Sequence, residues 1–185
     1  MKKLLSLTLA VGLVFLFGCG KQDTTLTPSD NEQESTQRTK YESAKDWFSI
    51  QYPNSRTFQE NVYESSVMFF TPITGDDTIQ ENVGIIKKVL DKDYTLDDYY
   101  TITKPELMRT IPGFVEVTTE KIKINDIDTQ KTIYKWTEGT YTLEWQQIYL
   151  IKDKQLYIIT YTATAATFDQ YLQQVNQMAA TLEVQ

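Results

Sequence analysis

The chain has 185 residues, a formal net charge of −7, one cysteine and no histidine. Without imidazole, Ser-His-Asp and Cys-His catalysis and histidine metal ligation are excluded. A single cysteine cannot build a disulfide framework. The negative charge opposes contact with nucleic-acid phosphates, so we expect no nucleic-acid partner.

The N-terminus has the pattern of an export signal. A charged start, Met1 to Lys3, precedes an apolar run from Leu4 to Phe17. This run is shorter than the ~20 residues of a membrane-spanning helix, which favours a cleaved signal peptide over residues 1–18. The segment Leu16-Phe17-Gly18-Cys19 resembles a bacterial lipobox, which implies cleavage after Gly18 and a diacylglyceryl thioether on Cys19. The alternative is an uncleaved N-terminal anchor with an incidental cysteine.

Lipidation of Cys19 predicts a protein held on a membrane. Each buried methylene contributes about 0.8 kcal/mol, and two or more acyl chains give stable anchoring. Lipidation also uses the chain's only thiol, which leaves no thiolate for catalysis or metal binding. The Lys, Ile, Tyr and Thr bias favours a Gram-positive host, so we expect the extracytoplasmic face of a bacterial cell membrane rather than a periplasm.

Residues 19–40 are predicted to be the lipidated N-terminus and a flexible tether. Leu26 is the only large apolar residue between positions 20 and 40, so this segment cannot bury enough surface to offset the entropy of ordering. Residues 41–185 have the size of one domain with a hydrophobic core. This domain carries 21 acidic and 13 basic residues, a net charge of −8.

The first half of the domain predicts strands followed by a helical region. Strands are expected at 47–52, 67–71 and 82–90, with loops at 54–66 and 73–81. Thr95 and Asp98 are spaced as a capping box at the start of the helix. Pro105 predicts a break or kink, and the helix should stop before Pro112.

After Gly113 the pattern changes to long strands joined by tight turns. Strands are predicted at 114–124, 129–137, 141–151 and 156–163, and turns this short join antiparallel neighbours. In the third of these strands, apolar residues point to both sides, which predicts a central strand covered on both faces. Thr167 and Gln170 are spaced as a second capping box, and the apolar spacing that follows predicts a final helix lying on the sheet.

Short segments spread over residues 46–183 carry a family resemblance. They are FSIQYP, MFFTP followed by NVGI, the YTL that opens the first helix, IPGF, the hairpin after IND, and YIITYTA followed by FDQYLQQVNQM. Together they resemble the PsbP-like domain family, which includes DcrB-type bacterial lipoproteins. The resemblance implies an α+β fold, a twisted antiparallel β-sheet with helices packed on both faces as an α/β/α sandwich. It also implies a non-catalytic accessory or assembly role and supplies no catalytic residues.

Two acidic sets are the candidate cation sites. Asp91, Asp93 and Asp97 alternate like the start of a calcium loop, but Leu96 and Ile102 occupy the positions where that loop needs glycine and glutamate. We interpret them as a solvated turn before a helix N-terminus. The second set is Asp76 and Asp77 with Glu81, interpreted as a loop tip. No serine-lysine motif or glycine-rich phosphate loop is present, so we assign no catalytic, cofactor-binding or metal-binding residue and expect no cofactor.

Aromatic residues on two neighbouring predicted strands form the other candidate surface. They are Tyr134, Trp136, Tyr141 and Trp145. Such a ladder could bind a protein or glycan, but cross-strand aromatic pairs more often pack in the core, which is the interpretation we favour.

The expected function is therefore that of a membrane-anchored, non-enzymatic lipoprotein. The leading hypothesis is an accessory or assembly role for an envelope protein, with contact to the membrane through Cys19. The alternative is a lipoprotein that binds a small ligand or divalent cation in a cleft between sheet and helix. A hydrolase of wall polymer would need a deep pocket with converging carboxylates.

Overall fold

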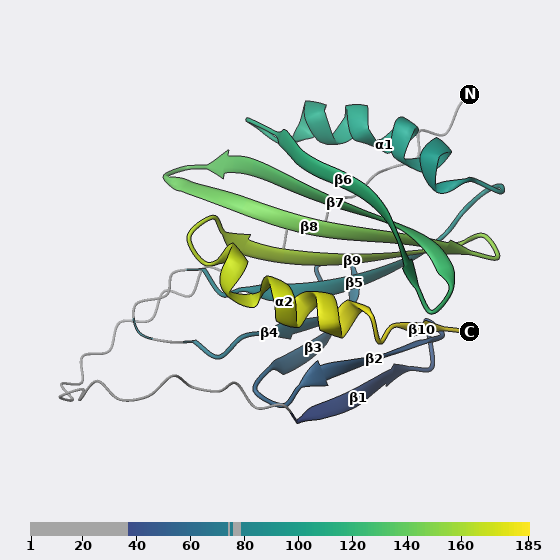
Figure 1. Cartoon of the computed structure of the whole chain (residues 1–185), viewed down its shortest axis with the longest axis horizontal. Helices are drawn as coiled ribbons and strands as arrows, with labels where there is room; N and C mark the ends of the chain where they lie inside the picture. The colour runs from purple at the N-terminus through teal and green to yellow at the C-terminus, as the bar shows by residue number, and fades with distance from the viewer. Residues whose placement is uncertain (1–36, 74, 76–78) are drawn as a thin grey trace.

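The computed structural model describes residues 37–73, 75 and 79–185 (Figure 1). The predicted signal peptide, Cys19 and the tether up to residue 36 lie outside the described residues. The first strand begins at Arg38, inside the stretch predicted as tether. In the part of the chain that the structure describes, no helix is long and apolar enough to cross a membrane.

The described residues form two antiparallel sheets and two helices. The larger sheet has seven strands in the order β3-β4-β5-β9-β8-β7-β6, and the smaller has the order β1-β2-β10. The strands are β1 (Arg38–Ser43), β2 (Phe48–Pro53), β3 (Thr57–Val62), β4 (Ser65–Phe70), β5 (Asn82–Val89), β6 (Val115–Ile124), β7 (Ile127–Glu138), β8 (Tyr141–Lys152), β9 (Gln155–Thr164) and β10 (Glu183–Val184). The helices are α1 (Leu96–Thr110) and α2 (Phe168–Ala179). The predicted α+β class, with a largely antiparallel sheet and two helices, is confirmed, and the separate small sheet adds to it.

Strand β8 is the centre of the molecule. All of its residues from Leu143 to Leu150 are buried. Leu143 and Trp145 share a cluster with Leu107 of α1, whereas Ile148 and Leu150 share a cluster with residues of α2. Alternate side chains of a strand point to opposite faces, so the predicted burial of this strand on both sides is confirmed.

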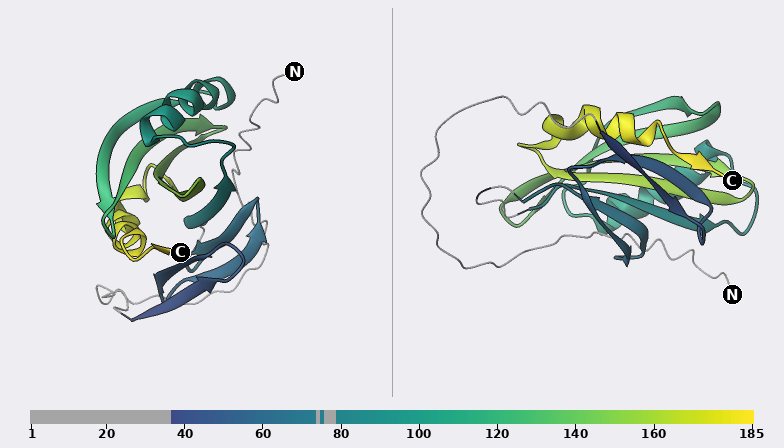
Figure 2. Two further views of the ribbon diagram at one scale, coloured as in Figure 1. Left: turned by 90° about the vertical axis from the view of Figure 1, so that its right-hand side faces the viewer. Right: turned by 90° about the horizontal axis from the view of Figure 1, so that it is seen from below.

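The small sheet and α2 close the larger of the hydrophobic clusters. Phe48 and Ile50 of β2 join Phe168 and Val175 of α2 in that cluster. The Tyr52 and Phe69 ring centroids lie 4.8 Å apart and connect the two sheets. Figure 2 shows the small sheet and α2 on the same side of the molecule, away from α1.

One predicted loop and one predicted helix break are wrong. The segment 54–66 contains strand β3, whose side chains are nearly all exposed, so the alternation that marks a half-buried strand is missing from its sequence. Helix α1 runs through Pro105 without interruption. Pro105 lies on the exposed side of α1, where water can satisfy the carbonyl that loses its partner, while Tyr99, Thr103 and Leu107 hold the other side on the sheet.

The two predicted helix caps have different outcomes. At α1 the capping box is confirmed, with the Thr95 hydroxyl accepting from the Asp98 N–H at 3.1 Å. At α2 the prediction is wrong, because Thr167 has helical backbone angles and makes no side-chain cap bond. Its hydroxyl instead lies 2.8 Å from the Thr164 hydroxyl. A partner outside the four-residue motif therefore competes for the capping group.

Replacing Thr95 by alanine tests the α1 cap. We expect a loss of about 1 kcal/mol in the free energy of unfolding, because an N–H at the helix start loses its partner. Urea unfolding followed by circular dichroism measures the change. Thr101→Ala, at an exposed position of the same helix, is the matched control and should change stability by less. Equal losses in both variants would contradict the capping role.

Candidate functional site

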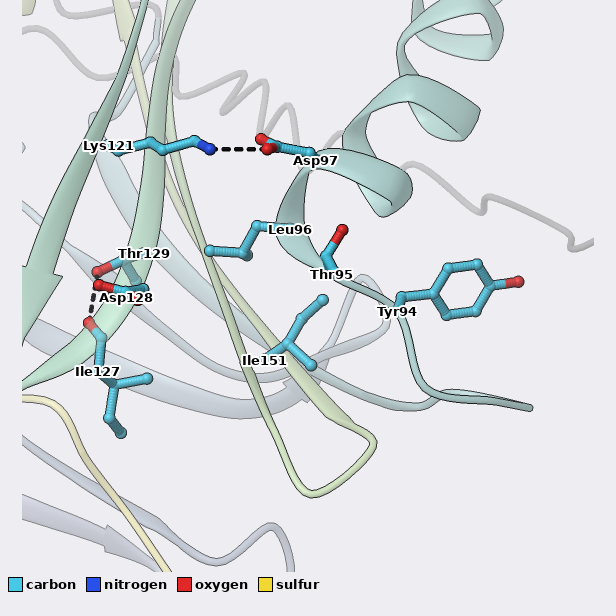
Figure 3. A pocket seen from close by; sticks show the side chains of 9 residues that line it. All are labelled: Tyr94, Thr95, Leu96, Asp97, Lys121, Ile127, Asp128, Thr129 and Ile151. Carbon is cyan, nitrogen blue, oxygen red and sulfur yellow. Dashed lines mark hydrogen bonds and ion pairs between the residues drawn. The ribbon is translucent and has the colours of Figure 1, made fainter.

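An open pocket of about 560 Å³ lies between the first turn of α1 and the strands β6, β7 and β8. Its apolar side chains are Leu96 from α1, Ile127 from β7 and Ile151 from β8 (Figure 3). Its remaining lining residues are Tyr94, Thr95, Asp97, Lys121, Asp128 and Thr129. The pocket thus combines an apolar floor with hydroxyl and charged groups at its rim, a mixture typical of sites for small molecules.

The charges at this rim are paired with one another. The Lys121 ammonium lies 2.7 Å from the Asp97 carboxylate, and Lys123 lies 2.8 Å from Asp128. Both pairs are largely exposed, so each contributes little to stability. A cation at this rim would have to displace two lysines, whereas an uncharged or amphipathic molecule would not.

The first acidic set does not gather around one point. Asp97 pairs with Lys121, and Asp93 lies 3.5 Å from Lys154. Asp91 is exposed in the turn before α1. Among the described residues, no three His, Cys, Asp or Glu side chains are placed to hold a metal ion together. The arrangement fits the interpretation as a solvated turn at a helix N-terminus.

Of the second acidic set, only Glu81 is among the described residues. Glu81 is buried, and its carboxylate accepts a hydrogen bond from the Thr71 hydroxyl at 3.2 Å. Asp76 and Asp77 lie outside the described residues.

The aromatic ladder belongs to the core. Trp136 and Trp145 are 3% and 2% exposed, and their ring centroids lie 4.0 Å apart. Tyr134 is fully buried, and Tyr141 packs against the same cluster. Packing therefore accounts for this ladder, and a contact surface built from it is ruled out.

A polar network beside the pocket links α1 to the sheet. The Tyr100 hydroxyl donates to the Glu116 carboxylate, and the Lys104 ammonium lies 2.7 Å from the same carboxylate. Burial opposes ionisation of Glu116, but the hydrogen bonds from Lys104 and Tyr100 outweigh it and lower the pKa of this carboxyl. Deeper in, the Tyr134 and Tyr149 hydroxyls lie 3.0 Å apart, and burial raises the pKa of both far above its usual range. Such tyrosines stay protonated, which suits a structural role.

Sequence reasoning missed most of the pocket. Asp97 was singled out, but its partner Lys121 is distant in sequence and belongs to another hairpin. Ile151 was predicted only as a strand residue, and Ile127 lay between two predicted strands, next to the expected turn. The side chains meet because the β6–β7 hairpin passes over the start of α1, and no local spacing encodes that contact.

The comparisons with known proteins give a family from the sequence and a fold from solved structures. The family model described as DcrB matches residues 57–181. PA94 from Pseudomonas aeruginosa has a similar structure, with a TM-score of 0.59, 18% identity and coverage of 80% of this chain and 97% of that chain. CyanoP, the cyanobacterial PsbP of Synechocystis sp. PCC 6803, has a TM-score of 0.60 and 15% identity, with coverage of 85% and 98%. No curated protein matches the sequence.

A third solved structure has the same fold. LpqN, involved in cell envelope biogenesis of Mycobacterium tuberculosis, has a TM-score of 0.62 and 10% identity, with coverage of 80% of this chain and 90% of that chain. At these identities the structural likeness establishes the PsbP-like fold alone.

Acidification tests the Glu116 network. Because the folded pKa of Glu116 lies below its ordinary value of 4.5, the carboxylate stabilises the fold above that pH, and this contribution is lost as the pH falls through the folded pKa. Glu116→Gln should therefore lower the free energy of unfolding by about 1 kcal/mol at neutral pH and by less in acid. Denaturant unfolding at several pH values measures the difference.

Glu120→Gln is the matched control for this measurement. Glu120 pairs with Lys131 on the same hairpin but is more exposed than Glu116. Glu120→Gln should lower the free energy of unfolding at neutral pH by less than Glu116→Gln does. If the difference in the free energy of unfolding between wild type and Glu116→Gln grew as the pH fell, the stabilising role of the Glu116 carboxylate would be contradicted.

Proposed function

The chain belongs to the DcrB family, and from this we propose that it is a membrane-anchored, non-catalytic accessory lipoprotein that binds an envelope protein and supports its assembly or stability. The family match covers most of the domain. LpqN, which shares the fold, is involved in cell envelope biogenesis. The lipobox at Cys19 supplies the anchor in this proposal and places the domain on the extracytoplasmic face of the membrane.

One observation of the site carries the non-catalytic part of the proposal. Two carboxylates that the fold shields from water are engaged by neighbouring side chains. Glu116 is held by Lys104 and Tyr100, and Glu144 lies buried 2.7 Å from Lys135. A carboxylate that works as general acid or base must instead reach a substrate.

The α/β/α sandwich is part of the same proposal. Its support is the alternation along β8, where neighbouring side chains contact α1 and α2 in turn. In that arrangement the helices shield the long central strands, while the strands at the sheet edges remain available to a partner.

A second candidate function is favoured by the pocket beside Asp97. Its apolar floor and paired charges suit a small amphipathic ligand, and a divalent cation is the less favoured occupant because Lys121 and Lys123 already neutralise the carboxylates. In this candidate the protein is still an anchored, non-enzymatic lipoprotein, but it binds a small molecule in place of an envelope protein.

Intact mass spectrometry of the protein purified from its own membrane tests the anchor. We expect a mass that lacks residues 1–18 and carries a diacylglyceryl group, with or without a further acyl chain, on Cys19. Cys19→Ala should keep the leader and carry no acyl chain, because the lipidated residue is missing. An unmodified Cys19 with the leader attached in the native protein would contradict the proposal.

Crosslinking in native membranes tests the accessory role. A tagged full-length chain should capture a defined envelope protein that a tether-only chain of residues 1–40 does not capture. Identification by mass spectrometry after quantitative comparison of the two samples is the readout. Equal recovery of every protein in both samples would argue against a domain-specific partner.

Calorimetry tests the cation form of the second candidate. Titration with Ca²⁺, Mn²⁺ and Zn²⁺ in turn should give a binding heat if a cation is the occupant, and Asp97→Asn should remove that heat. Asp169→Asn, in the first turn of α2, is the matched control and should retain it. Absence of heat with all three ions rules out the cation form of this candidate.

A further inference from the structure

Four hairpin turns gather at one end of the domain. They connect β1 to β2, β3 to β4, β6 to β7 and β8 to β9. Hydrogen bonds tie the β1–β2 turn to β3 and β9 at this end: Lys45 Nζ donates to Asn61 Oδ1 at 3.4 Å, and the Tyr157 hydroxyl donates to the Asp46 carbonyl at 3.2 Å. Figure 1 shows the β6–β7 and β8–β9 turns at its right-hand side. We call this the turn end.

The turn end contains all the non-glycine residues with left-handed backbone angles in the part of the chain that the structure describes. They are Trp47, Asn61, Tyr63, Glu64, Asn125, Asp126, Asp153 and Lys154. Asparagine and aspartate tolerate this conformation, whereas bulky side chains do so at a cost. Trp47 and Tyr63 are therefore unexpected in these positions.

Both aromatic rings point out of the fold. Trp47 has φ 59° and is 57% exposed, and Tyr63 has φ 48° and is 48% exposed. The Trp47 N–H closes its turn by donating to the Ser43 carbonyl at 2.8 Å, a bond that glycine or asparagine would make with less strain. Folding thus gains little from these two rings, and their exposed position points to a contact outside the domain.

The surroundings of the two rings contain an exposed valine and several lysines. Val89, at the end of β5, is 74% exposed. Among the described residues, the lysines without a carboxylate within 4.0 Å are Lys45, Lys87, Lys88, Lys92 and Lys152, and all lie near this end. Asp46, Glu64, Asp91, Asp126 and Asp153 share the end and match the five lysines in number, so its local charge is close to neutral, in contrast to the domain as a whole. Repulsion by an anionic surface is therefore weakest here.

We propose that the turn end docks on the lipid surface, with the Trp47 and Tyr63 rings at the headgroup level and the neighbouring lysines facing lipid phosphates. Tryptophan and tyrosine favour this region because each has an apolar ring and a polar tip. Lysine stems lie along the apolar boundary while their ammonium groups reach the phosphates. The docking rests on the anchoring part of the proposed function.

The geometry of the chain permits this docking. The chain enters the domain at Arg38, and the β1–β2 register pairs Arg38 with Pro53 and Ser43 with Phe48, so the point of entry is opposite the turn end. Residues 20–37 span up to about 60 Å when extended, and a 12-residue strand such as β8 measures about 40 Å. The tether can therefore reach back along the domain. Because the anchor keeps the local lipid concentration high, a weak contact is sufficient.

The three tryptophans of the chain make the docking measurable. Trp136 and Trp145 are buried, so a quencher located outside the fold acts mainly on the fluorescence of Trp47. The full-length lipidated protein is reconstituted into vesicles of phosphatidylcholine and phosphatidylglycerol, with or without bromine on the acyl chains. We expect brominated lipid to remove most of the emission that Trp47 contributes, defined as the difference between the native protein and Trp47→Phe. Equal emission in both kinds of vesicle overturns the docking.

Matched variants separate docking from folding. Tyr63→Asn should raise the melting temperature by about 2–4 °C through relief of backbone strain and should reduce the quenching of Trp47. Ile102→Asn, which changes an exposed apolar residue of α1, should leave the quenching unchanged. A lower melting temperature for Tyr63→Asn would show that the Tyr63 ring stabilises the fold. An equal loss of quenching in Tyr63→Asn and Ile102→Asn would contradict docking through the turn end.

Flotation distinguishes the two levels of the proposal. Protein that does not float with the vesicles contradicts the anchor and the docking that rests on it. Protein that floats but shows no quenching by brominated lipid contradicts the docking alone and leaves the accessory function standing.

Discussion

Burial of both faces of β8 is the constraint on which the rest of the structure depends. Side chains of β8 belong to two separate hydrophobic clusters: Leu143 and Trp145 share one with Leu107 of α1, whereas Ile148 and Leu150 share the other with residues of α2 and the small sheet. Several polar groups that β8 carries into the interior are engaged: the Gln146 amide donates to Asn176 Oδ1 at 3.0 Å, the Gln147 amide donates to the Thr160 hydroxyl at 3.1 Å, and Glu144 pairs with Lys135. Buried polar groups that find such partners avoid a large desolvation cost and fix the register of the neighbouring elements.

This constraint also decides where function can reside. The aromatic residues that most resemble a binding ladder are needed for the core, as Trp136 and Trp145 show, and the carboxylates near α1 are occupied by lysines. What is left for contact is at the periphery: an open pocket beside the α1 N-terminus, the edge strands β3 and β6, and the turn end. A domain of this kind suits an accessory role, in which a rigid body presents a surface, better than a reaction that needs a deep enclosed site.

The two peripheral features lie close together in the fold. Asp128 and Ile151 of the pocket are next to the turns at Asn125 and Asp153. Docking of the turn end on lipid would therefore place the pocket near the membrane surface and leave the opposite end, with Gly75, Gly139 and the start of α2, directed away from it. The two proposals are physically compatible, because an amphipathic ligand is most concentrated at that boundary.

Part of the site and most of the fold could be predicted from local patterns. The Thr95 cap, the hairpins at Asn125 and Asp153, and the two-sided burial of β8 all follow from spacing within one or two neighbouring segments. Strand β3 could not be predicted, because an exposed edge strand is stabilised by backbone pairing with β4 and carries no apolar alternation. The predicted capping role of Thr167 is wrong because Thr164 competes for its hydroxyl.

The sequence by itself determined the excluded chemistries, the export pattern that ends at Cys19, the α+β class and the apolar residues that must be buried, since composition and periodicity are properties of the chain alone. Only the tertiary structure decided which polar groups meet, because Asp97 and Lys121 or Tyr100 and Glu116 approach one another through packing between separate elements. The same holds for the turn end, where Trp47 and Tyr63 come from different hairpins and are strained by backbone angles that no residue pattern predicts.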